Sequence, residues 1–173
     1  DFSFGLDDFT IEVWCTDSSG GPSDGGVVTG ARWVFAMGGE TQSNWGATAN
    51  LFMAATGTTS TRFHLGGGQI GQGINVDVTY PVDPGWHHWA IVSESQYISI
   101  YRDGALVFGP TFNSNNLGGS GRWFIGNKTD NGYGNEWSAY NGAIDEIRVT
   151  KGVARYPGVF TPPSAAFGQC GSN

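Results

Sequence analysis

The chain has 173 residues, a length that suits one domain with a core large enough to need no metal ion or disulfide. Its formal net charge is −7, and its eight Lys and Arg residues form no basic cluster, which argues against nucleic acid and anionic membranes as partners. Glycine accounts for 29 residues, aromatic residues make up 14%, and there is no apolar run long enough for membrane insertion. This composition predicts an all-β protein.

We expect about ten to twelve strands, and ten segments have the short, alternating or β-branched pattern that is typical of them. The first, residues 9–15, places Phe9, Ile11, Val13 and Cys15 on one face. The others are residues 31–37, 51–55, 61–65, 74–78, 86–92, 97–101, 105–108, 122–126 and 143–149. Turns at residues 93–96 and at Asp103–Gly104 predict two successive hairpins. We predict a two-sheet antiparallel β-sandwich of the jelly-roll type.

The last predicted strand carries Asp145 on the same face as Ile147 and Val149. The opposite face takes Ile144, Glu146 and Arg148. An aspartate in phase with aliphatic residues is expected to be partly buried, so its charge requires a cation, backbone N–H groups or an arginine nearby. The prolines that follow predict a strap running extended along a surface up to Pro163. Residues 1–167 are predicted to form a single domain, and residues 168–173 a C-terminal tail.

Four phrases of the sequence occur in a characteristic order: WHHWAIV at 86–92, YISIYRDGALV at 97–107, WFIGN at 123–127 and NGAIDEIRVTKGVARYPGVFTPP at 141–163. Together with residues 9–12 they resemble the laminin-G-like branch of the concanavalin A-like lectin/glucanase superfamily. The closing TKGVARY and FTPP motif is similar to versions in bacteriophage virion proteins, including those of cyanophages. In such proteins a strand of the F-D-G type usually precedes residues 9–12, so we expect an N-terminal edge strand to be missing.

Glucanases of this fold carry E-x-D-x-E on one strand, which places two carboxylates on the same face about 5 Å apart. The sequence lacks this motif, and the adjacent Asp145 and Glu146 are predicted to face opposite ways. His87 and His88 are also neighbours on a strand, so they cannot chelate one metal ion together. We expect one of these histidines in the core or on a sheet face and the other against solvent. The sequence therefore predicts that the protein is not an enzyme.

The resemblance implies calcium as a cofactor, because related sandwiches often hold a calcium ion at a sheet edge or rim. Asp145, within the closing motif, is the first candidate ligand. The alternative is that its carboxylate accepts hydrogen bonds from backbone or from the neighbourhood of Arg148 without any metal. A second candidate cluster lies in the loop 127–140 and consists of Asp130, Asn131, Asn135 and Glu136, and weaker candidates are Asp7, Asp8 and Asp24.

Lectins stack an exposed aromatic ring on the apolar face of a pyranose and hold its hydroxyls with Asn, Asp and backbone groups. Trp45 and Trp137 lie in polar loops with this chemistry, although Trp137 could equally pack on the sandwich or anchor an interface. Five further tryptophans lie in predicted strands and are expected in the core: Trp14, Trp33, Trp86, Trp89 and Trp123. The predicted ligand-binding residues are Trp45, Asn131, Tyr133, Asn135, Trp137 and Tyr140, and the predicted metal ligands are Asp145, Asp130 and Glu136.

Two classes of function remain. The first is a non-catalytic carbohydrate-binding or adhesion module of a phage virion, on a tail fibre or the surface, or of a bacterial surface protein. Its partner would be a glycan or a host-surface polysaccharide. The second is a structural virion module, a capsid decoration or tail component, in contact with other virion proteins. Both predict a virion-surface or extracellular location. Cys15 and Cys170 are either two thiols or a bridge between the first and last segments.

Overall fold

The computed structural model describes residues 3–16, 32–38, 49–56, 59–66, 73–81, 83–117, 122–126 and 139–167. These ranges contain ten strands: β1 (Phe9–Thr16), β2 (Arg32–Gly38), β3 (Ala49–Ala55), β4 (Ser60–Leu65), β5 (Ile74–Thr79), β6 (Trp86–Glu94), β7 (Tyr97–Arg102), β8 (Ala105–Phe112), β9 (Arg122–Ile125) and β10 (Ile144–Lys151). Each predicted strand is confirmed, and the largest difference is β8, which extends to Phe112 instead of Phe108. Nowhere in the described ranges is there a helix long and apolar enough to cross a membrane.

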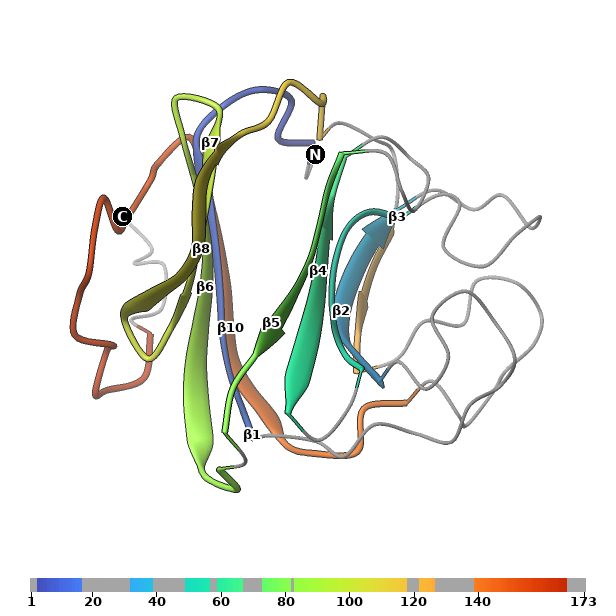
Figure 1. The fold of residues 1–173 in the computed structure, drawn as a ribbon, viewed down its shortest axis with the longest axis vertical. Helices are drawn as coiled ribbons and strands as arrows, with labels where there is room; N and C mark the ends of the chain where they lie inside the picture. Colours follow the sequence, from blue (N-terminus) through green and yellow to red (C-terminus); the bar gives the residue numbers. More distant parts are fainter. Residues whose placement is uncertain are drawn as a thin grey trace, which may run out of the picture.

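The strands form two antiparallel sheets that pack face to face (Figure 1). The first sheet has the order β10-β1-β6-β7-β8 and the second has the order β5-β4-β3-β2-β9. The predicted inward face of β1 is confirmed, because Phe9, Ile11, Val13 and Cys15 are each 2% exposed or less. Cys170 lies outside the described residues, so the structure does not test the two alternatives of separate thiols or a bridge to Cys15. The two-sheet sandwich predicted from the sequence is confirmed.

Residues 152–167, after β10, form the strap, which crosses the outer face of the first sheet and continues past the predicted end at Pro163 (Figure 1). Tyr156 and Phe160 stack with their ring centroids 3.7 Å apart and pack on outward-facing residues of β6 and β7. The backbone N–H of Phe160 also donates a hydrogen bond to the carbonyl of Gly104, in the turn between β7 and β8. The first sheet is therefore covered on both faces, by the second sheet and by the strap.

A β-bulge in β10 contradicts the predicted phase of Asp145. The register runs from Glu12 opposite Arg148 to Trp14 opposite Asp145, so β10 has one residue more than β1 across this interval. Glu146 has a φ of +52°, which accommodates the extra residue. Ile144, Ile147 and Val149 all pack against the core as a result. Asp145 is exposed instead of sharing the buried face of Ile147 and Val149.

We expect Gly104→Ala to loosen the strap. Gly104 has a φ of +79°, and a Cβ atom there would collide with the carbonyl of Phe160. Gly152 is the matched control, because its φ is +78° and a Cβ atom there meets no heavy atom within 4 Å. Gly152→Ala should cost about 1–2 kcal/mol of folding free energy through backbone strain alone. Gly104→Ala should cost about 1–3 kcal/mol more in urea unfolding, because the strap must move. Equal costs would contradict the strap contact.

Candidate functional site

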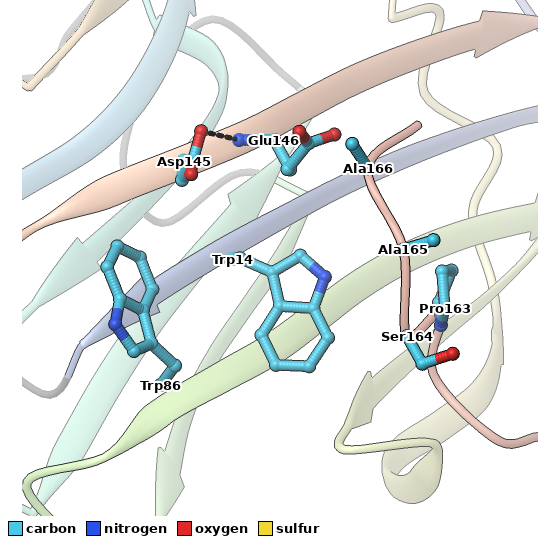
Figure 2. A pocket seen from close by; sticks show the side chains of 8 residues that line it. All are labelled: Trp14, Trp86, Asp145, Glu146, Pro163, Ser164, Ala165 and Ala166. Carbon is cyan, nitrogen blue, oxygen red and sulfur yellow. Dashed lines mark hydrogen bonds between the residues drawn. The ribbon is translucent and has the colours of Figure 1, made fainter. Parts of the chain in front are cut away.

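A pocket of about 380 Å³ opens on the outer face of the first sheet, where β1 ends and β6 and β10 begin. Figure 2 shows two indole rings and two acidic residues around this hollow, with the strap along its remaining side. The lining consists of Trp14, Trp86, Asp145, Glu146, Pro163, Ser164, Ala165 and Ala166. The pocket therefore combines aromatic surface, carboxylate oxygens and a hydroxyl group from four separate segments.

The two tryptophans reach the pocket through strand alternation. Trp14 lies between Val13 and Cys15, which face the core, so its indole points away from the core. β1 pairs with β6 so that Thr16 lies opposite Trp86, which places Trp86 on the same outer face. Trp86 is 48% exposed. The prediction that Trp14 and Trp86 belong to the core is wrong.

The other three strand tryptophans confirm the prediction of core positions. Trp33 and Trp89 are buried, at 7% and 1% exposed, and Trp123 is partly buried against the main core. Trp89 faces the interior of the sandwich, whereas Trp86 is three residues earlier and has the opposite phase. Strand phase therefore separates the packing tryptophans from those that line the pocket.

The bulge brings Asp145 and Glu146 to the same pocket, which corrects the prediction that these neighbours face opposite ways. Oδ1 of Asp145 accepts a hydrogen bond of 2.8 Å from the backbone N–H of Glu146. Oε2 of Glu146 accepts one of 2.6 Å from the backbone N–H of Phe167, at the end of the strap. Each carboxylate is therefore anchored by backbone at one of its two oxygen atoms. For Asp145, this anchor is a backbone hydrogen bond of the kind expected without a metal.

Glu12 of β1 ties the strap to the sheet beside the pocket. Its carboxylate is fully buried and accepts hydrogen bonds from Tyr156 of the strap, at 2.7 Å, and from Arg148 of β10, at 2.8 Å. His88 of β6 lies 3.3 Å away through Nε2. Burying a carboxylate is unfavourable unless donors surround it, and here three neighbouring segments supply them. The strap is held at this point by a charge and not only by apolar contact.

The Glu12 cluster shifts two pKa values in opposite directions. Burial alone would raise the pKa of the Glu12 carboxyl, but hydrogen bonds from His88, Tyr156 and Arg148, with the Arg148 charge, hold it below 4.5. Burial, followed by the hydrogen bond to Glu12, raises the pKa of Tyr156 to about 12. Nδ1 of His88 is buried with no hydrogen-bond partner within the described ranges, so the ring contacts the cluster through Nε2.

The structure corrects one expectation about the histidines. His87 and His88 do make contacts with different groups, since His87 bonds to Asp103 at 2.7 Å while His88 bonds to Glu12. Neither faces solvent, because His87 is 5% exposed and His88 is fully buried. The expectation of one solvent-facing histidine failed because the strap covers the outer face of β6.

Most of the residues predicted to bind a ligand or a metal ion lie outside the described ranges. Of the nine residues predicted as ligand-binding residues or principal metal ligands, Tyr140 and Asp145 fall in described ranges, as do the weaker candidates Asp7 and Asp8. Tyr140 is half-buried against the core, and its hydroxyl donates a hydrogen bond to the carbonyl of Thr16. This contact links the segment before β10 to the end of β1. The ligand-binding role of Tyr140 stays a prediction. Asp145 lies in the pocket. The predicted residues outside the described ranges are Trp45, Asp130, Asn131, Tyr133, Asn135, Glu136 and Trp137.

The described residues supply only part of a calcium site. Calcium requires about six to eight oxygen ligands, and the pocket offers the carboxylates of Asp145 and Glu146. Within the described ranges, no group of three or more acidic, His or Cys side chains could hold a metal ion. A complete site at Asp145 would need further oxygen ligands beyond these two carboxylates. The separate candidate cluster with Asp130 and Glu136 lies outside the described ranges. Calcium binding at Asp145 therefore stays a prediction.

The fold and the pocket define a lectin-type β-sandwich with an aromatic and acidic hollow on its outer face. The family model Laminin_G_3, described as the concanavalin A-like lectin/glucanases superfamily, matches residues 1–155, and the chain belongs to this family. The resemblance to the concanavalin A-like lectin/glucanase superfamily is thereby confirmed. No sequence among the curated proteins matches the chain.

Solved structures share the fold at low sequence identity. The sialidase carbohydrate-binding module CBM40 of Ruminococcus gnavus, bound to α2,3-sialyllactose, is 15% identical with a TM-score of 0.60, and the match covers 84% of this chain and 76% of that one. A SAP-like pentraxin of Limulus polyphemus is 14% identical with a TM-score of 0.55, over 85% and 65% of the two chains. A Trypanosoma rangeli sialidase in complex with sialic acid is 12% identical with a TM-score of 0.54, over 84% and 21%. This chain therefore spans 65% of the pentraxin and about a fifth of the sialidase.

We expect Glu12→Gln to destabilise the fold by about 2–4 kcal/mol at pH 7, because it leaves Arg148 and Tyr156 without a charged acceptor. The pKa of Glu12 is lower in the folded protein than in the unfolded chain, so its ionised form contributes stability above about pH 4.5. That contribution is lost as the pH falls through the lower folded-state pKa. In urea unfolding between pH 7 and pH 3, the difference in unfolding free energy between the parent protein and Glu12→Gln should therefore shrink at low pH. Glu94→Gln, at an exposed position, is the matched control. If the stability lost in Glu12→Gln did not depend on pH, this explanation would be wrong.

The calcium prediction is tested by thermal unfolding. If Asp145 is a ligand, added calcium should raise the melting temperature and a chelator should lower it, because a ligand that binds the folded state stabilises it. Asp145→Asn should remove this response, whereas Glu94→Gln, which removes the same charge at an exposed position elsewhere on the first sheet, should keep it. If neither calcium nor the chelator changes the melting temperature, Asp145 is not a calcium ligand.

Proposed function

We propose that the protein is a non-catalytic carbohydrate-binding module and that the pocket formed by Trp14, Trp86, Asp145 and Glu146 is its binding site. The observation that carries the proposal is the half-exposed indole of Trp86 beside anchored carboxylates in a hollow of about 380 Å³. An indole offers a flat apolar surface to the C–H face of a pyranose, and carboxylate oxygens accept hydrogen bonds from its hydroxyls. The R. gnavus module, which has the same fold, is bound to a glycan in its structure.

The hydrogen bonds of the two carboxylates support a binding role over hydrolysis. A glycosidase needs one carboxyl group that delivers a proton to the leaving oxygen and a second that acts as nucleophile or base. Here Glu146 accepts from the backbone of Phe167, and Asp145 accepts from the backbone of Glu146. Both groups are fixed as acceptors by the strap and the bulge, which suits the recognition of hydroxyl groups.

The setting we propose is a phage virion, on a tail fibre or the surface, or a bacterial surface protein, with a host polysaccharide as partner. The support for this setting is the closing motif at residues 150–163, which resembles virion proteins. Virion-surface or extracellular location follows from the same proposal.

A second candidate is a structural virion module, a capsid decoration or tail component, that contacts other virion proteins. Exposed apolar residues of the edge strand β8 favour it: Leu106 is 43% exposed and Phe112 is 55% exposed. Tyr97 of β7, at 49% exposed, packs beside Phe112 with ring centroids 5.5 Å apart. Exposed aromatic and aliphatic residues at a sheet edge are typical of protein contacts.

Trp86→Ala should weaken binding to a glycan array or to host polysaccharide about tenfold or more, because a stacked aromatic ring commonly contributes more than 1 kcal/mol. The exposed Phe112→Ala on β8 is the matched control and should keep full binding with an unchanged melting temperature. Trp137→Ala, measured in parallel, tests the alternative that the ligand binds to the loop 127–140 predicted from the sequence. Loss of binding in Trp137→Ala alone would move the site to the loop. Absence of binding in the parent protein would favour the structural module.

A further inference from the structure

The polar groups of the pocket carry negative charge. Asp145 and Glu146 line it together with the hydroxyl of Ser164, and its described lining contains no Lys, Arg or His. The chain as a whole has 15 Asp and Glu against eight Lys and Arg. A ligand carboxylate placed in this hollow would meet two like charges at close range, which is unfavourable even at a partly exposed site.

The two arginines that follow the pocket residues of β10 in sequence make contacts with groups outside the pocket. Arg148 donates to Glu12 through Nε at 2.8 Å and through Nη2 at 2.7 Å, and its guanidinium stacks over Phe167 at 3.9 Å. Arg155 donates to Thr150 at 2.7 Å. Lys151 is six residues beyond Asp145 on β10, which corresponds to about 20 Å along an extended strand. Lys128 is the only Lys or Arg in the segments outside the described ranges.

The carboxylates have the capacity to bind a further donor. Asp145 uses Oδ1 for the N–H of Glu146, and Glu146 uses Oε2 for the N–H of Phe167. Within the described ranges, the second oxygen of each carboxylate makes no hydrogen bond. Two indole rings lie beside them (Figure 2). An ammonium group is attracted both to carboxylates and to the face of a tryptophan ring.

We propose that this pocket selects a sugar with a free ammonium group, such as a glucosamine residue, over neutral sugars and rejects acidic ones. This inference rests on the proposed carbohydrate-binding function and adds the charge class of the ligand. The ammonium group is held by the second oxygens of Asp145 and Glu146, while the pyranose ring stacks on Trp86. The R. gnavus module has a similar fold and is bound to sialyllactose, an acidic sugar, so the fold alone does not dictate the charge of the ligand.

The test is calorimetric titration of the 173-residue chain with three probes at pH 6 and moderate salt. The probes are a glucosamine tetramer, the N-acetylglucosamine tetramer of the same linkage, and α2,3-sialyllactose. The first two differ in the charge of the amino group and its acetyl cap. We expect the glucosamine tetramer to bind about fivefold or more tightly than the acetylated one, because exposed charge pairs and cation–π contacts each contribute up to about 1 kcal/mol. Sialyllactose should bind most weakly, and added salt should reduce the preference.

Asp145→Asn and Glu146→Gln should each reduce the preference about twofold, and the double variant should bind the two tetramers about equally. Glu94→Gln removes the same charge elsewhere on the first sheet and should leave the preference unchanged. Tighter binding of the acetylated tetramer or of sialyllactose would overturn the charge assignment and leave the carbohydrate-binding function standing. A preference that survives in the double variant would also overturn it. Absence of binding to all three probes and to a broader glycan array would overturn both proposals.

Discussion

The buried carboxylate of Glu12 is the group on which the outer half of the molecule depends. It lies between a sheet and a strap, where its charge is tolerated because Arg148, Tyr156 and His88 converge on it from three segments. Each of these donors comes from a different part of the chain, so the cluster forms only when β10, β6 and the strap are all in place. Removing any donor leaves a buried charge that is less well compensated, which couples strap docking to the packing of the sheet.

The pocket follows from this docking and from the bulge in β10. A regular strand would place Asp145 and Glu146 on opposite faces, and one of them would then point into the core. The extra residue lets Ile144 and Ile147 both pack inward while the two carboxylates line the outer hollow. The strap completes the remaining wall, because Phe167 is held by Glu146 through its backbone and by Arg148 through its ring. Packing of aliphatic residues and placement of the acidic pair are therefore two results of one irregularity.

The sequence predicts the fold well because strand alternation and turn residues are local signals, and all ten strands and the strap follow from them. It predicts the site poorly for three physical reasons. A bulge has no strong local signature, so alternation along a regular strand predicts the wrong phase for Asp145. Membership of a strand predicts a core position for Trp14, although its place between Val13 and Cys15 indicates the opposite face. The contacts of Glu12 with Arg148 and Tyr156 join residues more than 130 positions apart, which no local pattern reveals.

The same contacts that hold the strap also set the charge of the pocket. Arg148 is the cation closest along β10 to Asp145 and Glu146, and it could have neutralised them had its guanidinium been available. Glu12 and the ring of Phe167 engage it instead, on the side of the strand that the strap covers. Because Glu12 pairs with Arg148, this arginine does not neutralise the pocket, where two acidic residues lie beside two indole rings. The preference for a cationic sugar is then a consequence of how the strap is fastened, because the fold uses its nearest arginine for structure.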